Sequence, residues 1–405
     1  MIITILVRKI SFFLIICSFL SPAFSQTVEL DSLKQNLTLY PKSDSIRAQL
    51  LYDYAVKMRR YNPSSSENIY FECIKIASES HTESLHAKAL NGLAVVYGMQ
   101  GNYPSSIEYF SKALEFGKLI GKAEYAGGAY NGLGIVYKRL GDYPQSLIYY
   151  SESLKLYDSI DAKIGKANTL DNIGVLYDLM HEPEKSMEYY QKSLQIYEEE
   201  DDQLSILSIK TNIAVLFLGQ NRYEEALEIF MANWHSYDSL GRVAATISPR
   251  SNAGFVLIKL KRYDEAENIL LEALKIAKQS EMLQEQTDIL NNLYEIAIET
   301  EKNDEALEYA QKYSNLAKDL GSKKFTANSY AIFAEIYEKL GKYPKALSAY
   351  KMHKAWSDSL FNEDKERAFN AQEVKVEVLQ KNKQLAEQNL RMDYLQERVT
   401  QEERL

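Results

Sequence analysis

The chain has 405 residues, of which 46% are hydrophobic and 25% are charged, as is usual for a folded soluble protein. Its 17 glycines and 8 prolines are too few for a β-sandwich or β-barrel, which needs many turns. The net charge of −9, with no basic stripe in the sequence, argues against a nucleic-acid partner.

Residues 1–25 are predicted to be a secretory signal peptide. Arg8 and Lys9 supply the positive region, residues 10–20 form an apolar run, and small residues follow. This run is too short to span a bilayer, so we expect a mature chain without a membrane span, exported to the periplasm or the envelope. Two alternatives stay open, an uncleaved N-terminal anchor and a lipoprotein acylated at Cys17.

A 40-residue period follows a lead-in at residues 26–44 and extends over residues 45–356. Tyrosine recurs at this step, at Tyr103, Tyr143, Tyr223, Tyr263 and Tyr343. Small residues recur at the same step, at Ala94, Gly134, Gly174, Ala214, Gly254 and Ala334. A fixed period of this size predicts stacked copies of one supersecondary unit, which offer a surface rather than a catalytic pocket.

One copy, residues 127–160, shows what the unit is. Apolar or small residues follow helical spacing from Tyr130 to Tyr137, and a second amphipathic run comes after the turn. Gly141 suits a left-handed helix C-cap, and Pro144 suits the first turn of the next helix. Each unit is therefore predicted to be a helix, a tight turn and a second helix, with the small residue allowing close approach.

The unit at residues 287–320 departs most from this pattern. Tyr294 occupies the small position, and Ala297 occupies the place where tyrosine is usual. We predict that Tyr294 fills the space that Ala297 leaves, because the larger side chain at one position roughly offsets the smaller side chain at the other. The alternative is that the two helices splay apart there.

The recurring motifs resemble the tetratricopeptide repeat. Residues 131–137 read Asn-Gly-Leu-Gly-Ile-Val-Tyr and recur in related form at each step, and residues 141–143 read Gly-Asp-Tyr at the turn. The 40-residue length is similar to the long-helix members of that family. The resemblance implies an all-α fold, a right-handed superhelical solenoid of about eight tetratricopeptide-like hairpins followed by a long C-terminal helix.

Residues 357–405 are predicted to form that long charged helix. They contain no proline or glycine and are rich in Glu, Lys, Gln and Leu. Apolar residues seven apart indicate a weak coiled coil, at Ala371, Val378, Leu385, Met392 and Val399. We predict a homodimer through residues 357–405; the alternative is a solvated helix that packs back on the last repeat.

Asp358-Ser359-Leu360-Phe361 and the charged stretch after it resemble the end of the repeats in periplasmic sensors of Bacteroidetes-type bacteria. In those tetratricopeptide histidine kinases and regulators, a membrane span and a cytoplasmic output follow. The resemblance implies the sensing part of a signalling system, whose partner is a peptide or a protein. The alternative is a structural or assembly scaffold of the cell envelope without signalling output.

The first helix of each unit lines the concave face in this family. At about 100° per residue, one set of asparagines and aliphatic residues points away from the predicted core. The amides could hydrogen-bond a peptide backbone while the apolar residues hold its side chains. Alternatively, these side chains join neighbouring repeats. The predicted groove residues are Asn131, Asn172, Asn212, Asn252, Asn292, Val215, Leu218, Phe255 and Ile258.

No motif for chemistry stands out. The five histidines lack metal-ligand spacing, and there is no phosphate loop, nucleophile elbow or zinc-protease motif. We therefore expect no catalytic, cofactor-binding or metal site, and no enzyme. Cys73 would be the one cysteine of the mature chain, and its apolar neighbours predict a buried, inert thiol.

Overall fold

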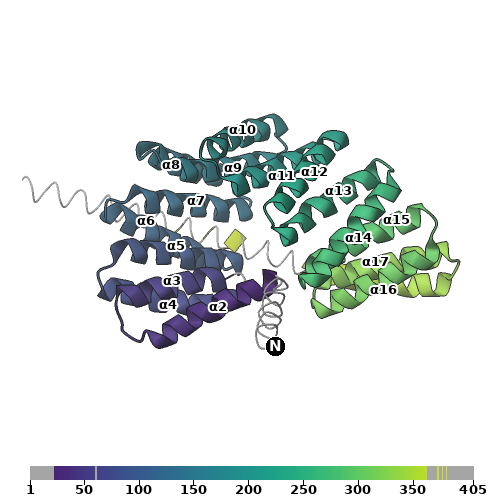
Figure 1. Ribbon diagram of the computed structural model, residues 1–405, viewed down its shortest axis with the longest axis horizontal. Helices are drawn as coiled ribbons and strands as arrows, with labels where there is room; N and C mark the ends of the chain where they lie inside the picture. The colour runs from purple at the N-terminus through teal and green to yellow at the C-terminus, as the bar shows by residue number, and fades with distance from the viewer. Residues whose placement is uncertain (1–21, 60–61, 363–371, 374–375, 377–379, 381–405) are drawn as a thin grey trace, which may run out of the picture. The chain divides into compact units, whose positions relative to one another are not determined.

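The computed structural model describes residues 22–59 and 62–362, with a few further positions between 372 and 380. These residues form α-helices joined by short connections, and none of them forms a strand, which confirms the predicted all-α class (Figure 1). The helices are α2 (Pro22–Leu39), α3 (Ser45–Met58), α4 (Pro63–Glu79), α5 (Glu83–Met99), α6 (Tyr103–Leu119), α7 (Ala123–Arg139), α8 (Tyr143–Ser159), α9 (Lys163–Leu179), α10 (Pro183–Glu199), α11 (Gln203–Gly219), α12 (Tyr223–Ser239), η1 (Val243–Thr246), α13 (Ile247–Lys259), α14 (Tyr263–Gln279), α15 (Leu283–Glu299), α16 (Asn303–Asp319) and α17 (Lys323–Lys339).

Residues 343–362 are also helical and complete the last of eight hairpins in the described part of the chain. Each hairpin pairs an odd-numbered helix with the helix that follows it, from α3 with α4 onward. His353 joins the last pair, because its Nδ1 lies 2.9 Å from the carbonyl oxygen of Ala327 in α17. The predicted series of about eight hairpins is therefore confirmed.

The connections repeat every 20 residues rather than every 40. Helices α4 to α12 have 17 residues each, and a residue with positive φ follows each of them. After α5, the Asn102 N–H donates to Tyr97 O at 2.9 Å and the Gly101 N–H donates to Gly98 O at 3.4 Å, a Schellman motif. Gly141 has φ +73°, as predicted for a C-cap glycine. Eight other positions adopt this conformation without glycine: His81, Asp161, His181, Asp201, Asn221, Lys261, Glu281 and Glu301.

Helix α13 begins differently from the other helices. The 3-10 turn η1 precedes it, and Pro249 occupies its third position. Proline has no N–H to donate to the carbonyl four residues earlier, so the regular α-helical bond cannot form there. The pattern of 17-residue helices resumes with α14.

Close packing within a hairpin depends on the small residue and on a large residue sixteen positions later. A Cβ atom at Gly134 would lie 2.4 Å from Cε1 of Tyr150, and one at Gly174 would lie 2.6 Å from the ring of Tyr190. Both rings are buried. The predicted close approach of the two helices is therefore confirmed, because no side chain fits at these positions.

The hairpin of α15 and α16 reverses this arrangement of the small and the large residue. Tyr294 is buried at the small position, and Ala310, sixteen residues later, is fully buried where other hairpins hold a ring or leucine. The Tyr294 hydroxyl donates to Glu335 Oε2 at 3.0 Å. Ala310 in the facing helix α16 therefore compensates for the large side chain of Tyr294. Ala297 is buried in the same core cluster, and the predicted exchange between Tyr294 and Ala297 stays a prediction.

Buried polar side chains bind carbonyl oxygens across several of the hairpins. Ser146 Oγ donates to Gly134 O at 2.7 Å, and Ser153 Oγ donates to Gly127 O at 2.9 Å. Cys73 occupies a related position, with its Sγ 3.3 Å from Ala48 O. The predicted burial of this cysteine is confirmed, and because burial raises the pKa of the thiol to about 12, its inertness stays a prediction.

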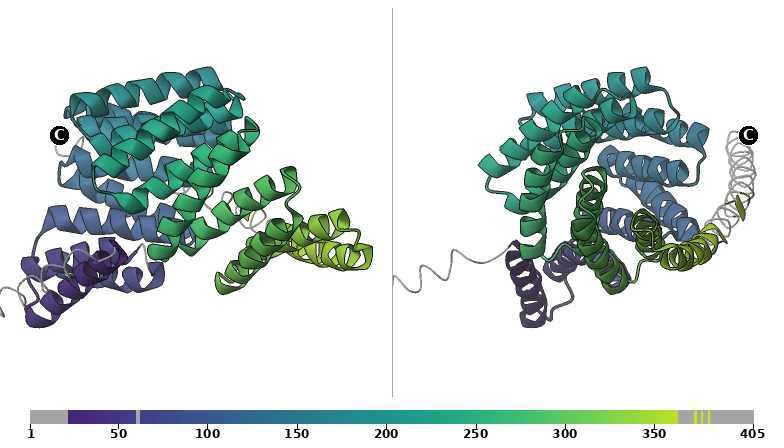
Figure 2. Two further views of the ribbon diagram at one scale, coloured as in Figure 1. Left: turned by 45° about the vertical axis from the view of Figure 1, so that its right-hand side comes forward. Right: turned by 90° about the vertical axis from the view of Figure 1, so that its right-hand side faces the viewer.

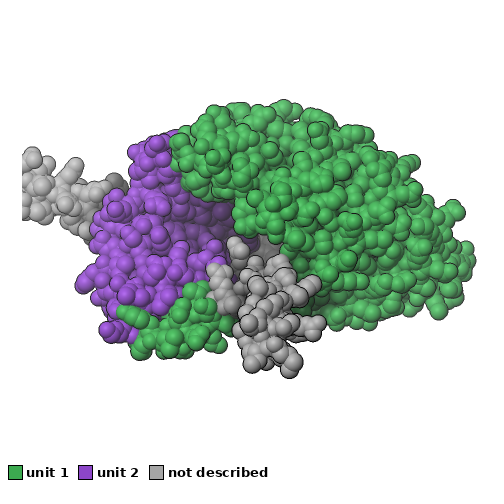
Figure 3. All heavy atoms as spheres, viewed as in Figure 1, with its two compact units in different colours: residues 1–41, 163–360 green, residues 42–162, 361–405 purple. Residues whose placement is uncertain are grey.

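The hairpins group into two compact units (Figure 3). Helices α3 to α8 lie in residues 42–162, with a core centred on Leu133 and Phe110. Helices α9 to α17 lie in residues 163–360, where successive helices pack side by side (Figure 2). In each unit the first helices of neighbouring hairpins also contact one another, as α5 and α7 do in one unit and α13 and α15 in the other.

The predictions for the two ends of the chain fall mostly on residues outside the described ranges. Residues 1–21 of the predicted signal peptide lie outside the described residues, and α2 covers its last residues and most of the lead-in. The predicted coiled-coil seam lies in residues 363–405, of which only a few positions are described. None of the described helices is both long and apolar enough for a membrane span.

Candidate binding surfaces

The predicted groove residues lie on the first helices of the hairpins, but they do not share one environment. The five asparagines are partly exposed, and Val215 is 45% exposed. Leu218 and Phe255 are partly buried. Ile258 is only 4% exposed and belongs to the core of residues 163–360, so the structure removes it from the surface. It lies one helical turn beyond Gly254, on the side that faces α14.

Two of the asparagines are already engaged by neighbouring groups. Asn212 Nδ2 donates to Asp171 Oδ1 at 2.9 Å, which joins α11 to α9. Asn172 Nδ2 donates to Asn168 O at 3.0 Å, one turn earlier in its own helix. Asn212 therefore has the inter-repeat contact that was the alternative to ligand binding.

Asn252 and Asn292 differ, because no hydrogen bond within the described residues engages either amide. Both line a pocket of about 440 Å³ that α13, α15, α16 and α17 form, which we call the polar pocket. Its other residues are mostly polar or charged: Ile247, Ser248, Ser251, Phe255, Glu285, Asp288, Asn291, Tyr313, Lys324, Phe325 and Asn328. Three predicted residues, Asn252, Phe255 and Asn292, thus come together at one site.

The electrostatics of the polar pocket favour a cation. Burial raises the pKa of Asp288, and the neighbouring Glu285 carboxylate raises it further, whereas Lys324 lowers it. Both burial and the Glu285 carboxylate therefore act against the negative charge on Asp288. A positively charged group of a ligand would relieve this repulsion.

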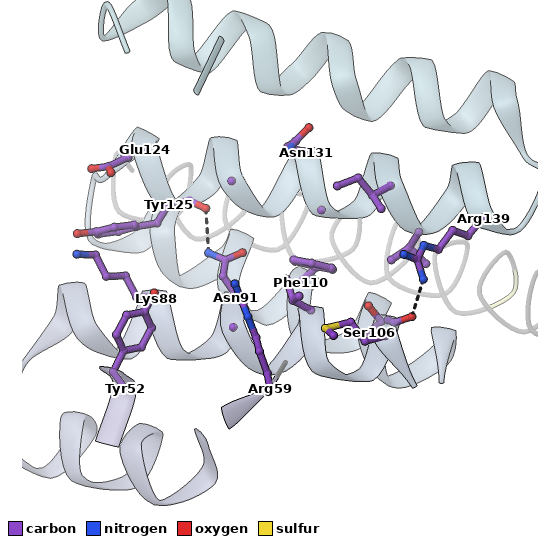
Figure 4. A pocket seen from close by; sticks show the side chains of 18 of the residues that line it. Tyr52, Arg59, Lys88, Asn91, Ser106, Phe110, Glu124, Tyr125, Asn131 and Arg139 are labelled. Atoms are coloured by element: carbon purple, nitrogen blue, oxygen red, sulfur yellow. Dashed lines mark hydrogen bonds between the residues drawn. The ribbon is translucent and has the colours of Figure 1, made fainter. Parts of the chain in front are cut away.

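A second pocket lies within residues 42–162 and was not predicted (Figure 4). It has a volume of about 550 Å³, and α3, α5, α6, α7 and α8 contribute to its lining. Four of the lining residues are glycines, at positions 92, 98, 128 and 132, and we call it the glycine pocket. Asn131 is the one predicted groove residue that lines it.

The sequence contained a signal for the glycine pocket. The position two before the small residue is asparagine in α9, α11, α13 and α15 but glycine in α5 and α7, at Gly92 and Gly132. The glycines mark where α5 and α7 differ from the later first helices, and the rings of Tyr70 and Phe110 occupy the places of the two missing side chains. Within the described residues, no cluster of His, Cys, Asp and Glu could hold a metal ion.

Comparison with known proteins places the repeats in a family. Residues 125–199 and 167–232 match one family model described as tetratricopeptide repeat, and residues 86–119 and 246–280 match another with the same description. No curated protein sequence matches the chain.

Among solved structures, the chain is similar to a Signal Transduction ATPase with Numerous Domains that has a tetratricopeptide repeat sensor, from Pyrococcus horikoshii, with TM-score 0.60, 13% identity and 85% of this chain covered. The match covers 54% of that protein, so the chain spans about half its length. The apo quorum sensor NprR from B. thuringiensis has TM-score 0.54 and 16% identity, with 84% of this chain and 96% of that chain covered.

A Rap protein complexed with Competence and Sporulation Factor has TM-score 0.50 and 15% identity, with 78% of this chain and 99% of that chain covered. At these identities the likeness is one of fold. Together with the helical hairpins and the matching segments, it leads to one conclusion. Residues 86–119, 125–232 and 246–280 of this chain are tetratricopeptide repeats.

Proposed function

We propose that this protein is an exported interaction module that binds an extended peptide, or a segment of a partner protein, in the polar pocket. The observation that carries the proposal is the pair of unengaged amides, Asn252 and Asn292, at equivalent positions of neighbouring hairpins. Each amide offers two N–H donors and a carbonyl acceptor. A peptide backbone presents complementary groups at regular intervals, so two such amides can hold it in one register.

The charges of the pocket indicate the kind of peptide. Glu285 and Asp288 outnumber Lys324 among the charged lining residues, and the ring of Phe255 supplies an apolar contact. Electrostatic complementarity then favours a segment with a basic side chain beside an apolar one. An acidic segment would meet like charge.

Several observations support the role of a sensor. The repeats form a scaffold that in general serves interaction rather than catalysis. Two proteins of similar fold are described as a quorum sensor and as having a tetratricopeptide repeat sensor. The sequence at residues 358–361 resembles the end of periplasmic sensor repeats, and residues 1–25 carry the signal-peptide pattern.

A peptide-selection experiment tests the binding site. Peptides are selected on the full mature chain from a random displayed library, and the tightest is measured against variants by fluorescence anisotropy. Asn252→Ala and Asn292→Ala should each weaken binding about 2- to 10-fold, the equivalent of one hydrogen bond, with unchanged thermal stability. Asn212→Ala is the control outside the pocket, and at a temperature well below its melting point it should bind the peptide as the wild type does. Selected peptides whose binding ignores both replacements would exclude the polar pocket.

The finer parts of the proposal need their own tests. Fractionation of the source cells should recover the protein in the periplasm or envelope, without its first 25 residues. Sedimentation of the mature chain and of a chain ending at residue 356 tests the proposed homodimer through residues 357–405. A monomer in both cases would refute dimerisation by this segment.

A further inference from the structure

The glycines that line the glycine pocket allow an aromatic ring to approach at one position and leave open space at another. A Cβ atom at Gly132 would lie 2.2 Å from Cε1 of Phe110, so the ring occupies the place of a side chain there. At Gly128, one turn earlier, a Cβ would meet only the Tyr157 hydroxyl, at 3.6 Å. The space above Gly128 is therefore open. Val95 and Ile135 add aliphatic surface on either side.

Three cations surround this apolar surface. Arg59, Lys88 and Arg139 line the pocket, and Glu124 is the one carboxylate among the described lining residues. No carboxylate of the described chain forms an ion pair with any of the three cations. By contrast, lysines elsewhere in the same unit do find such partners, as Lys112 does with Glu108 at 2.7 Å.

The arrangement of these cations leaves their charge available. Arg139 Nη1 donates to the carbonyl oxygen of Gly98 at 3.2 Å, which holds the guanidinium at one end of the pocket (Figure 4). Lys88 Nζ lies 6.0 Å from the centre of the Tyr125 ring at the other end. A backbone carbonyl and an aromatic ring orient a cation without neutralising it.

Asn91 adds a requirement for a hydrogen-bond donor. Its Nδ2 donates to the carbonyl oxygens of Ala87 and Tyr125, at 3.3 Å each, which fixes the orientation of the amide. Its Oδ1 is buried and accepts no hydrogen bond from the described residues. A buried acceptor without a donor is costly, and a ligand that supplies an N–H or O–H group would satisfy it.

We propose that the glycine pocket binds a small molecule with a carboxylate or similar anionic group, an apolar body and one N–H or O–H donor. The anionic group would pair with the unpaired guanidinium groups, and the body would lie on Phe110 above Gly128. A pocket of about 550 Å³ suits a ligand of drug-like size. This site is separate from the polar pocket, whose charge favours the opposite kind of ligand.

The test uses the full mature chain and dansyl-L-phenylalanine, which has a carboxylate, aromatic rings and a sulfonamide N–H. Its primary amide is the matched neutral probe. Fluorescence titration should show the acid binding at least tenfold more tightly than the amide. Arg59→Gln and Arg139→Gln should each weaken the acid about 10-fold and leave the amide unchanged, whereas Lys112→Gln should change neither.

A second variant tests the location independently of charge. Gly128→Leu places a side chain in the open part of the pocket, on a helix that tolerates leucine, and should abolish binding of both probes. Circular dichroism checks that the variant is folded. Equal affinity of acid and amide, or unchanged binding to Gly128→Leu, would overturn the proposal.

Competition identifies the source of the anionic group. A hexapeptide with a free C-terminal phenylalanine is compared with its C-terminal amide as a competitor of the probe. Competition by the free acid alone would support the same chemistry presented by a chain end. Because Asn252→Ala should leave the probe titration unchanged, failure here is distinguishable from failure of the proposed peptide site.

Discussion

Replacing Gly134 by alanine tests how the two helices of a hairpin are held together. The new methyl group would lie 2.4 Å from Cε1 of Tyr150, well inside van der Waals contact. The ring of Tyr150 is fully buried and cannot move into solvent. Either α7 and α8 separate or the ring takes a strained rotamer, and such overpacking costs about 1–3 kcal/mol.

The same helix offers a matched control at Gly128. A methyl group there would lie 3.6 Å from the Tyr157 hydroxyl, which is an ordinary contact distance. Both replacements lie inside α7, so both gain the helix preference of alanine over glycine, about 0.5–1 kcal/mol. Gly128→Ala should therefore stabilise the protein. The difference between the two variants removes this shared gain and leaves the overpacking cost, about 1–3 kcal/mol.

Urea unfolding followed by circular dichroism measures both variants. Repeat proteins can unfold in segments, so hydrogen exchange of the amides in α7 and α8 should accompany it. We expect a lower midpoint and faster exchange in both helices for Gly134→Ala, and a higher midpoint for Gly128→Ala. Equal stabilisation by the two replacements would show that the small residue is not what lets the helices approach, and the packing argument would fail.

Further outcomes follow for other parts of the chain. Lys261→Gly should raise the free energy of unfolding by about 1 kcal/mol, because φ +59° strains a lysine but not a glycine; a lower urea midpoint would contradict this. Asn212→Ala should lower it by about 1–2 kcal/mol by removing the hydrogen bond that joins α11 to Asp171 in α9, as thermal melting would show. The pKa of Asp288 is raised in the folded chain. Its contribution to the free energy of unfolding is therefore fully present below the ordinary pKa of aspartate and is lost as pH rises through the pKa of the folded state. Asp288→Asn should melt higher than wild type at pH 7 but not at pH 3. Cys73 should resist a thiol reagent at pH 8 until the chain unfolds, and fast labelling of the native protein would refute its burial.

The sequence was sufficient to predict the hairpins because their determinants are local. The ladder of small residues, the turn motif at Gly141 and the helical spacing each appear within a few positions of one another. The 20-residue repeat of the connections was less visible, since residues such as Lys261 and Glu301 adopt a conformation that their side chains disfavour. Tertiary packing overrides that local preference.

The candidate sites were harder to predict because they depend on packing between helices. The exchange of Tyr294 with Ala310 follows from the register of α15 against α16, which neighbouring positions in one helix do not reveal. Likewise, the equivalent residues Asn212 and Asn252 differ only in whether a hydrogen-bond partner lies within reach. The open space at Gly128 depends on which rings reach α7 from the neighbouring helices, and the repeat period does not show this.

The uniform connections have a consequence for how the length of this protein can change. Each helix from α4 to α12 is followed by a left-handed residue. Joining one such residue to the residue after its equivalent 40 positions later would therefore remove one hairpin and restore the same connection. Loss or duplication of a hairpin thus disturbs only the side chains that meet at the splice. The number of hairpins can therefore change by whole hairpins while each connection keeps the same backbone geometry.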